Sequence, residues 1–155
     1  MTTTHDDVAP ELIDAMVRLR PGGMTWRRTF PGRPDQVPEA RRFVRFLLAD
    51  SPVRDDAEQV AAELAANAVR HTASGQARGT FIVEVLRRAT ATRVTVYDCG
   101  WGPTPSFTRR DRPDALGEDG RGLPLVAALA SQVGYRGSQA LGHAVWALFA
   151  AGEPR

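Results

Sequence analysis

The stretch ELAANAVRHT, residues 63–72, joins a run of small apolar residues to three polar side chains spaced four apart. Its alanines favour a helix, and a helix brings residues four apart onto one face. Glu63, Asn67 and His71 therefore form a polar stripe. Two interpretations stay open: a solvated face that ends in a histidine favoured by the helix dipole, or a face that presents a carboxylate and an amide oxygen to a ligand.

Beside this polar stripe, the same helix has two apolar stripes that indicate packing against a sheet. Small residues in these stripes would let the helix approach the sheet closely. The first stripe contains Val60, Leu64 and Ala68, and the second contains Ala61, Ala65 and Val69.

Hydrophobic periodicity predicts the elements around this helix. Their order is strand, helix, helix, strand, strand, helix, strand, strand. This order predicts an α+β fold, a two-layer α/β sandwich with a mostly antiparallel sheet and helices on one face. The expected strands cover 25–30, 80–88, 92–98, 133–138 and 143–149, and the expected helices cover 39–50, Asp55 or Asp56 to 72, and 123–132, with a loop over 99–122.

The 155-residue chain, 43% hydrophobic and 25% charged, has the composition of one globular domain. We expect this domain over residues 24–152, after a flexible extension, residues 1–23, in which 10–20 has the pattern of a short amphipathic helix. No apolar run reaches the length of a membrane span, and the start lacks a secretory signal pattern. Together with a single cysteine, Cys99, these features predict a cytoplasmic protein without membrane segments.

The basic residues number 20, and every one is arginine. They are spread along the chain, and the net charge is only +2, so we expect no direct binding of nucleic acid. A chain without lysine has neither a Walker A lysine nor the strand lysine of protein kinases. Any nucleotide must therefore be bound in another way.

A second motif, VTVYDCGWGP (94–103), ends a predicted strand with a carboxylate and two glycines. Asp98 lies in phase with two core valines, where a carboxylate needs hydrogen-bond donors. Gly100 and Gly102 permit positive φ or close approach of the backbone. The donor is either the exocyclic amine of a purine or the backbone amides of a strand-terminating turn, and both interpretations stay open.

The third motif, GEDGRGLPLV (117–126), places Gly120, Arg121 and Gly122 directly before an apolar helix. Backbone amides at a helix N-terminus bind anions, and an arginine adds a charge-assisted contact to phosphate. A flexible loop that enters a helix is the other interpretation. No GxGxxG follows a strand here, so the motif is not a Rossmann fingerprint.

Taken in this order, the three motifs resemble those of the GHKL ATPase superfamily, which includes gyrase, Hsp90, histidine kinase and MutL ATP-binding domains. Within it, the chain is similar to the anti-sigma-factor serine kinases of the RsbW-like group. The similarity covers roughly residues 25–150 and implies the Bergerat ATP-binding fold. ELAANAVRH is similar to the N box, DCGWGP to the first glycine box, GRGLPLV to the second and GHAVWALF to the last strand.

The resemblance implies a role for each motif. Glu63 would orient or deprotonate the attacking hydroxyl or a water, Asn67 would hold Mg²⁺ against the triphosphate of ATP, and Asp98 would accept from the adenine amine. Residues 104–119 would form the nucleotide lid. The other expected ATP-binding residues are Arg70, His71, Gly100, Gly102, Gly120, Arg121, Gly122 and Leu123.

Two positions depart from the family pattern. Trp101 stands between the two glycines, where it would stack near the base or cover the pocket. Many family members carry threonine hydroxyls after the glycine of the last strand, and these contact adenine indirectly. His143 and Ala144 replace them here, which puts that contact in question.

The resemblance implies an ATP-binding regulatory protein, an anti-sigma factor and serine/threonine-protein kinase in transcription regulation. It would phosphorylate a STAS-type anti-anti-sigma partner, bind a sigma factor and form a homodimer. Retention of both Glu63 and Asn67 favours the enzyme. The alternative is an ATP-dependent module that sequesters a sigma factor or another regulator without phosphotransfer. A two-component histidine kinase is set aside, because the 23-residue extension with His5 is too short for its dimerisation helices.

Overall fold

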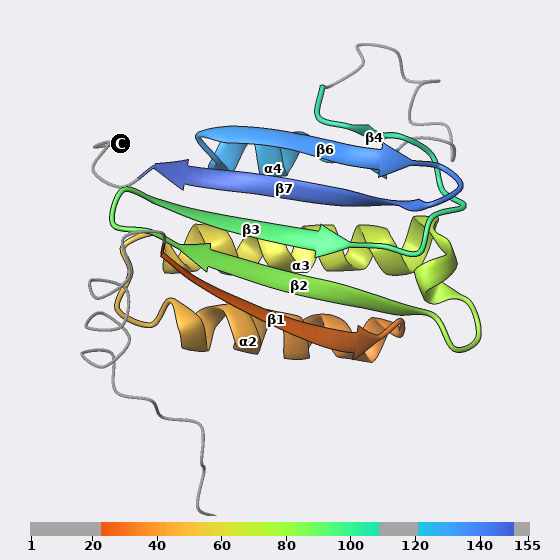
Figure 1. The fold of residues 1–155 in the computed structure, drawn as a ribbon, viewed down its shortest axis with the longest axis horizontal. Helices are drawn as coiled ribbons and strands as arrows, with labels where there is room; N and C mark the ends of the chain where they lie inside the picture. Colours follow the sequence, from red (N-terminus) through yellow and green to blue (C-terminus); the bar gives the residue numbers. More distant parts are fainter. Residues whose placement is uncertain (1–22, 109–120, 151–155) are drawn as a thin grey trace, which may run out of the picture.

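The structure is a computed structural model that describes residues 23–108 and 121–150, with the backbone alone for 121 and 122 (Figure 1). It shows a sheet with helices on one face, so the expected α+β sandwich is confirmed. The strands of the main sheet are β1 (Met24–Pro31), β2 (Thr80–Arg87), β3 (Ala91–Tyr97), β6 (Gln132–Ser138) and β7 (Gly142–Ala150). The helices are α2 (Val37–Leu47), α3 (Arg54–His71) and α4 (Pro124–Leu129), with the short 3₁₀ turns η1 (Pro34–Gln36) and η2 (Ala73–Gly75).

The main sheet has the strand order β1-β2-β3-β7-β6, and all its neighbouring strands are antiparallel. In Figure 1, α2 lies behind β1, α3 behind the middle of the sheet and α4 behind β6 and β7. The expectation of a mostly antiparallel sheet with helices on one face is therefore confirmed.

The core lies between the helix-facing side of the sheet and the helices, and it includes buried residues of α2 and α4 as well as α3. Valines at alternate positions of β2 and β3 face it, as the period of two predicts. Both apolar stripes of α3 face it too, although Val69 is only partly buried. Small alanines let the helix lie close to the strands. The buried members of the two helix stripes are Val60, Ala61, Leu64, Ala65 and Ala68, and the buried valines of β2 and β3 are Val83, Val85, Val94 and Val96.

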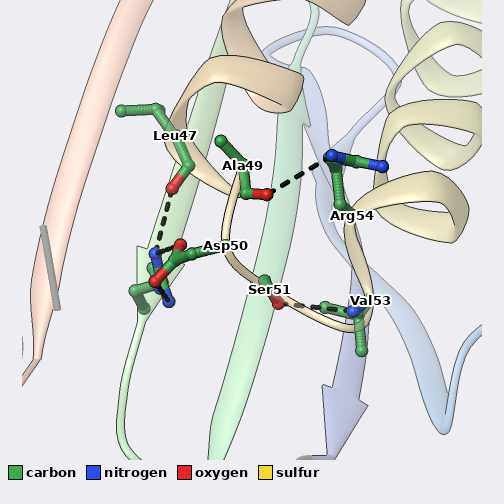
Figure 2. Close-up of polar contacts among 7 residues, drawn as sticks. Leu47, Ala49, Asp50, Ser51, Val53 and Arg54 are labelled. Atoms are coloured by element: carbon green, nitrogen blue, oxygen red, sulfur yellow. Dashed lines mark hydrogen bonds and ion pairs between the residues drawn. The ribbon is translucent and has the colours of Figure 1, made fainter. Parts of the chain in front are cut away.

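The link between α2 and α3 is held by polar contacts with the sheet and within the link (Figure 2). Arg87, from β2, donates to the carbonyl oxygen of Leu47 at 3.1 Å and to the carboxylate of Asp50. The first of these bonds satisfies a carbonyl at the end of α2, which lacks a partner within its helix. Across the link, Arg54 donates to the carbonyl oxygen of Ala49 at 3.3 Å.

The start of α3 differs from the prediction. Val53 is the N-cap residue, without a side-chain cap, whereas Asp55 or Asp56 was expected to cap the helix. Both aspartates lie within the first turn instead. Carboxylates there still interact favourably with the helix dipole, so their presence marks the first turn and not the cap itself.

The end of α4 and the loop before it also differ from the prediction. Helix α4 ends at Leu129, because Ala130 has extended backbone, whereas the prediction continued the helix to residue 132. Inside the expected loop, β4 (Pro105–Ser106) pairs in parallel with β5 (Arg121–Gly122). Strands of two residues are too short to leave a periodic pattern. The proposed extension lies outside the described residues, except for Gly23.

The structure also bears on membrane insertion. Over 23–108 and 121–150, no helix is both long enough and apolar enough to cross a bilayer.

Candidate functional site

The polar stripe of α3 is partly buried. Asn67 is only 5% exposed, and its Oδ1 atom is enclosed without a hydrogen-bond partner among the described residues. Glu63 is half-buried and makes no hydrogen bond or ion pair within the part of the chain that the structure describes. A buried polar atom without a partner costs about 1–3 kcal/mol. A solvated helix face therefore does not describe Asn67, and the oxygen is suited to a ligand.

His71, the third member of the stripe, is the last residue of α3 and is half-buried. Its carbonyl oxygen lies against Gly102, in the turn that follows β3. The end of α3 and the second motif are therefore in contact.

Asp98 follows β3 directly, and its Oδ1 atom accepts two backbone hydrogen bonds. The amide of Gly100 donates at 2.8 Å, and the amide of His143, on β7, donates at 3.0 Å. The strand-terminating turn is therefore present. These two bonds fix the orientation of the carboxylate, and they leave its role toward adenine a prediction.

Gly100 and Gly102 are required by neighbouring backbone. Gly100 has φ of 81°, and a Cβ atom there would overlap the β6–β7 turn at Gly142. A Cβ atom on Gly102 would overlap the carbonyl oxygen of His71. Positive φ at Gly100 and close backbone packing at both glycines are thus the two uses that the sequence predicted for these residues.

Hydrogen bonds hold the Asp98 turn on two sides. Two of them join it to η2, which follows α3 in the chain, and one joins it to the β6–β7 turn. The helix that carries Asn67 and the turn that carries Asp98 therefore lie together at one end of the sheet. The three bonds run from the amide of Ala73 to the carbonyl of Gly100 at 2.7 Å, from the amide of Cys99 to Oγ of Ser74 at 3.0 Å, and from the amide of Trp101 to the carbonyl of Gln139 at 2.6 Å.

Arg70 follows Asn67 by three residues, near the C-terminal end of α3. Its side chain is exposed and lines a cavity of ≈ 430 Å³ together with Arg33 and Val37. The other α3 residues that line this cavity are Ala66 and Val69, on the side of the helix next to α2. Arg70 is thus exposed three residues after Asn67 on the same helix, and its contact with the nucleotide stays a prediction.

The third motif is described only in part, since Gly120 lies outside the described residues. Arg121 and Gly122 form β5 through their backbone. The side chain of Leu123 is buried in the core, and its amide donates to the carbonyl of Ser106 at 2.8 Å. Pro124, the first residue of α4, has no amide hydrogen. The N-terminus of α4 therefore offers fewer amides to an anion than expected.

The two departures from the family pattern occupy contrasting environments. Trp101 is 75% exposed and has φ of 59°, which is uncommon for a residue other than glycine. His143 is buried, and its ring stands edge-on to Tyr135 with 5.7 Å between the centroids. No pattern in the sequence pointed to Tyr135, because it is an ordinary strand residue until β6 pairs with β7.

Comparison with family models matches residues 30–149 to the histidine kinase-like ATPase domain. The chain belongs to the histidine kinase-like ATPase family. The resemblance inferred from the three motifs is therefore confirmed at the level of the family. As a histidine kinase-like ATPase domain, the chain has ATP as its expected nucleotide, and both Glu63 and Asp98 lie within the matched range.

A solved structure with a similar fold contains the RsbU and RsbW domains of Rv1364c from Mycobacterium tuberculosis. The two share 18% sequence identity with a TM-score of 0.57, over 81% of this chain and 31% of that chain. At this identity the likeness shows the fold alone, and this histidine kinase-like ATPase domain spans less than a third of the longer protein. Comparison with curated protein sequences gives no match.

Proposed function

We propose that the protein is an ATP-binding regulatory serine/threonine-protein kinase and anti-sigma factor. It transfers the γ-phosphate of ATP to a serine of a STAS-type anti-anti-sigma partner. The observation that carries this proposal is the pair on α3, a half-buried Glu63 without a partner among the described residues and, one turn later, the enclosed Oδ1 of Asn67. A module that only binds ATP requires no carboxylate base beside the phosphates.

The residues present fit Mg²⁺. The described residues contain no group of three or more His, Cys, Asp or Glu side chains that would hold a metal by themselves. Mg²⁺ keeps several waters and binds substrate phosphates, so one amide oxygen is a sufficient protein ligand. Asn67 would supply that oxygen, and the ion would neutralise charge on the triphosphate.

Glu63 would act on the attacking group. In the proposed reaction, the serine oxygen forms a bond to the γ-phosphorus as the bond from that phosphorus to the ADP oxygen breaks. The serine proton passes to the carboxylate of Glu63, which also orients the hydroxyl. One helical turn separates Glu63 from Asn67, so one rigid helix carries both the base and the metal ligand.

Asp98 would recognise adenine through its carboxylate, which the amides of Gly100 and His143 hold in place. A fixed acceptor discriminates well between a purine that carries an amine and one that carries a carbonyl. The same proposal includes the other predicted ATP contacts, a sigma factor as a second partner, a homodimer, and action in the cytoplasm. The other contacts are Arg70, His71, Gly100, Gly102, Gly120, Arg121, Gly122 and Leu123.

The test uses the purified full-length protein with γ-labelled ATP, Mg²⁺ and a STAS protein encoded beside it. We expect label on a serine of the STAS protein. Glu63→Ala should abolish the transfer and leave ATP affinity nearly unchanged. The matched control is Glu58→Ala. Glu58 is also a half-buried carboxylate of α3, but its carboxylate pairs with Arg41 at 3.4 Å.

The outcomes separate the candidate functions. Equal transfer by Glu63→Ala and the wild type would remove Glu63 as the base. ATP binding without transfer to any STAS protein, together with ATP-dependent capture of a sigma factor, would favour the sequestering module instead.

A further inference from the structure

The second face of the main sheet carries no helix among the described residues, and Figure 1 looks onto it. The cross-strand register arranges its side chains in three rows, each running from β1 to β6. The first row contains Thr25, Leu86, Arg93, Leu148 and Gln132, the second Arg27, Glu84, Thr95, Trp146 and Gly134, and the third Thr29, Ile82, Tyr97, Ala144 and Arg136. We call these residues the open sheet face.

The second row of this face contains a buried carboxylate with several polar partners. The side chain of Glu84 is only 3% exposed, although no described helix covers it. It pairs with Arg27, accepts from the hydroxyl of Tyr97 at 3.1 Å and lies 3.7 Å from Arg93. The hydrogen bond and the charge of Glu84 raise the pKa of Arg27. A buried carboxylate requires such partners.

The arginines of the face outnumber this carboxylate. Arg136 reaches over the small Ala144 and donates to the hydroxyl of Tyr97 at 3.2 Å. With Arg27 and Arg93, three guanidinium groups stand against one carboxylate. In addition, Nε of Arg93 is enclosed without an acceptor in the described part of the chain. An excess of two positive charges and an enclosed N–H group without an acceptor suit further carboxylates.

The chain carries such carboxylates ahead of β1, separated from it by residues 18–23, which include Arg18 and Arg20. Residues 6–17, DDVAPELIDAMV, contain four acidic side chains and no basic one, together with Leu12, Ile13, Met16 and Val17. In the first row of the open sheet face, Arg93 lies between Leu148, which is partly exposed, and Leu86, of which only 9% is exposed. Apolar and acidic groups of the segment thus match apolar and basic groups of the face.

The lengths match too. A helix over residues 10–20 would be about 16 Å long, and the four strand spacings of the sheet amount to about 19 Å. Residues 21–23 would connect such a helix to β1 and reach at most about 10 Å. Gly23 has φ of 84°, a conformation that suits a change of chain direction, and Thr25 begins the first row.

We propose that residues 6–17 dock on the open sheet face of their own chain, with their carboxylates beside Arg93 and Arg136 and their apolar side chains on Leu86 and Leu148. This contact is independent of the proposed kinase activity. It gives the N-terminal segment a role as a cover for the sheet face opposite the helices.

Disulfide trapping tests the contact directly in the full-length protein. In a Cys99→Ser background, Ile13→Cys is combined with Leu148→Cys or, where Leu148→Cys fails to fold, with the exposed Gln132→Cys. The control combines Ile13→Cys with Arg42→Cys on α2, whose side chain is 72% exposed. At low protein concentration, we expect an intramolecular disulfide with residue 148 or 132 at least tenfold faster than with residue 42.

Two different results of the disulfide experiment would contradict the proposal. Equal rates at the sheet and at α2 would overturn docking. Disulfides that join two chains, even at low concentration, would also overturn it, because the occupant would then be a second copy.

Charge coupling gives an independent check by thermal unfolding. Arg136→Glu should lower the midpoint by about 3 °C. The loss should shrink by at least half when the acidic residues are neutralised by Asp6→Asn, Asp7→Asn, Glu11→Gln and Asp14→Asn. An identical loss in both backgrounds would overturn the proposal.

Discussion

The guanidinium of Arg87 donates two hydrogen bonds to the carboxylate of Asp50, at 2.8 and 3.2 Å. The two residues are 37 positions apart and join the end of β2 to the link between α2 and α3. Burial acts to raise the pKa of Asp50, but the hydrogen bond and the charge of Arg87 outweigh it, so the pKa is lowered from 3.8. The pair therefore couples the stability of the two layers to pH.

Asp50→Asn should lower the free energy of unfolding at pH 7 by about 1 kcal/mol, the size expected of a largely shielded ion pair. Because the folded pKa lies below the unfolded value, the carboxylate contributes fully above pH 3.8 and loses its contribution as pH falls through the folded pKa. Urea unfolding at pH 7 and pH 3 should show the difference between variant and wild type shrinking at pH 3. Asp35→Asn, in an exposed pair with Arg33, is the control and should change little. A difference that is constant with pH would contradict the assignment.

Asn67→Ala should separate stability from nucleotide binding. Removal of an amide whose oxygen lacks a partner among the described residues should leave the stability of the free protein unchanged or slightly raised. ATP affinity measured with Mg²⁺ should fall at least tenfold, and affinity measured with EDTA should change little. Calorimetric titrations under both conditions check this. Equal loss with and without Mg²⁺ would assign Asn67 to the nucleotide itself.

Asp98→Asn should weaken ATP binding far more than GTP binding, by about tenfold or 1.4 kcal/mol for one reversed hydrogen bond. The asparagine retains an oxygen that accepts from the amides of Gly100 and His143, so the turn should persist. Competition titrations with ATP and GTP measure the ratio, and circular dichroism confirms the fold. An unchanged ratio would exclude Asp98 from adenine recognition.

Trp101→Gly should raise the free energy of unfolding by about 0.5 kcal/mol. Glycine relieves a left-handed backbone that costs other residues about 1–2 kcal/mol, and greater freedom of the unfolded chain offsets part of the gain. Leu141→Gly is the control, because Leu141 is 89% exposed and does not have a positive φ. It should not stabilise the protein. If both variants lose stability equally, the backbone at residue 101 carries no strain.

The layers of the fold were predictable because they depend on local periodicity. Alternation marked β2 and β3, and the alanine stripes marked the buried side of α3. The pairing of β4 with β5 was not predictable, since two residues leave no period. Similarly, no local pattern reveals a contact such as that of Arg87 with Asp50, which exists only once distant elements have packed.

The candidate site was predictable to a similar degree. Spacing placed Glu63 and Asn67 on one stripe, and alternation placed Asp98 at the end of a strand. Sequence could not show that Arg70 lines a cavity together with Arg33, or which neighbouring backbone atoms require Gly100 and Gly102. These facts depend on which neighbours the folded chain brings close.

The anchoring of the Asp98 turn has a consequence for the energetics of binding. Bonds to η2 on one side and to the β6–β7 turn on the other fix this turn before any nucleotide arrives. At the proposed ATP site, adenine would therefore bind to a turn that is already ordered. Ordering this turn would then cost little of the binding free energy. The rate of any slow conformational step in nucleotide binding should then depend on the phosphates of the ligand and not on its adenine. Association kinetics of ATP, ADP and adenosine would distinguish the two ends.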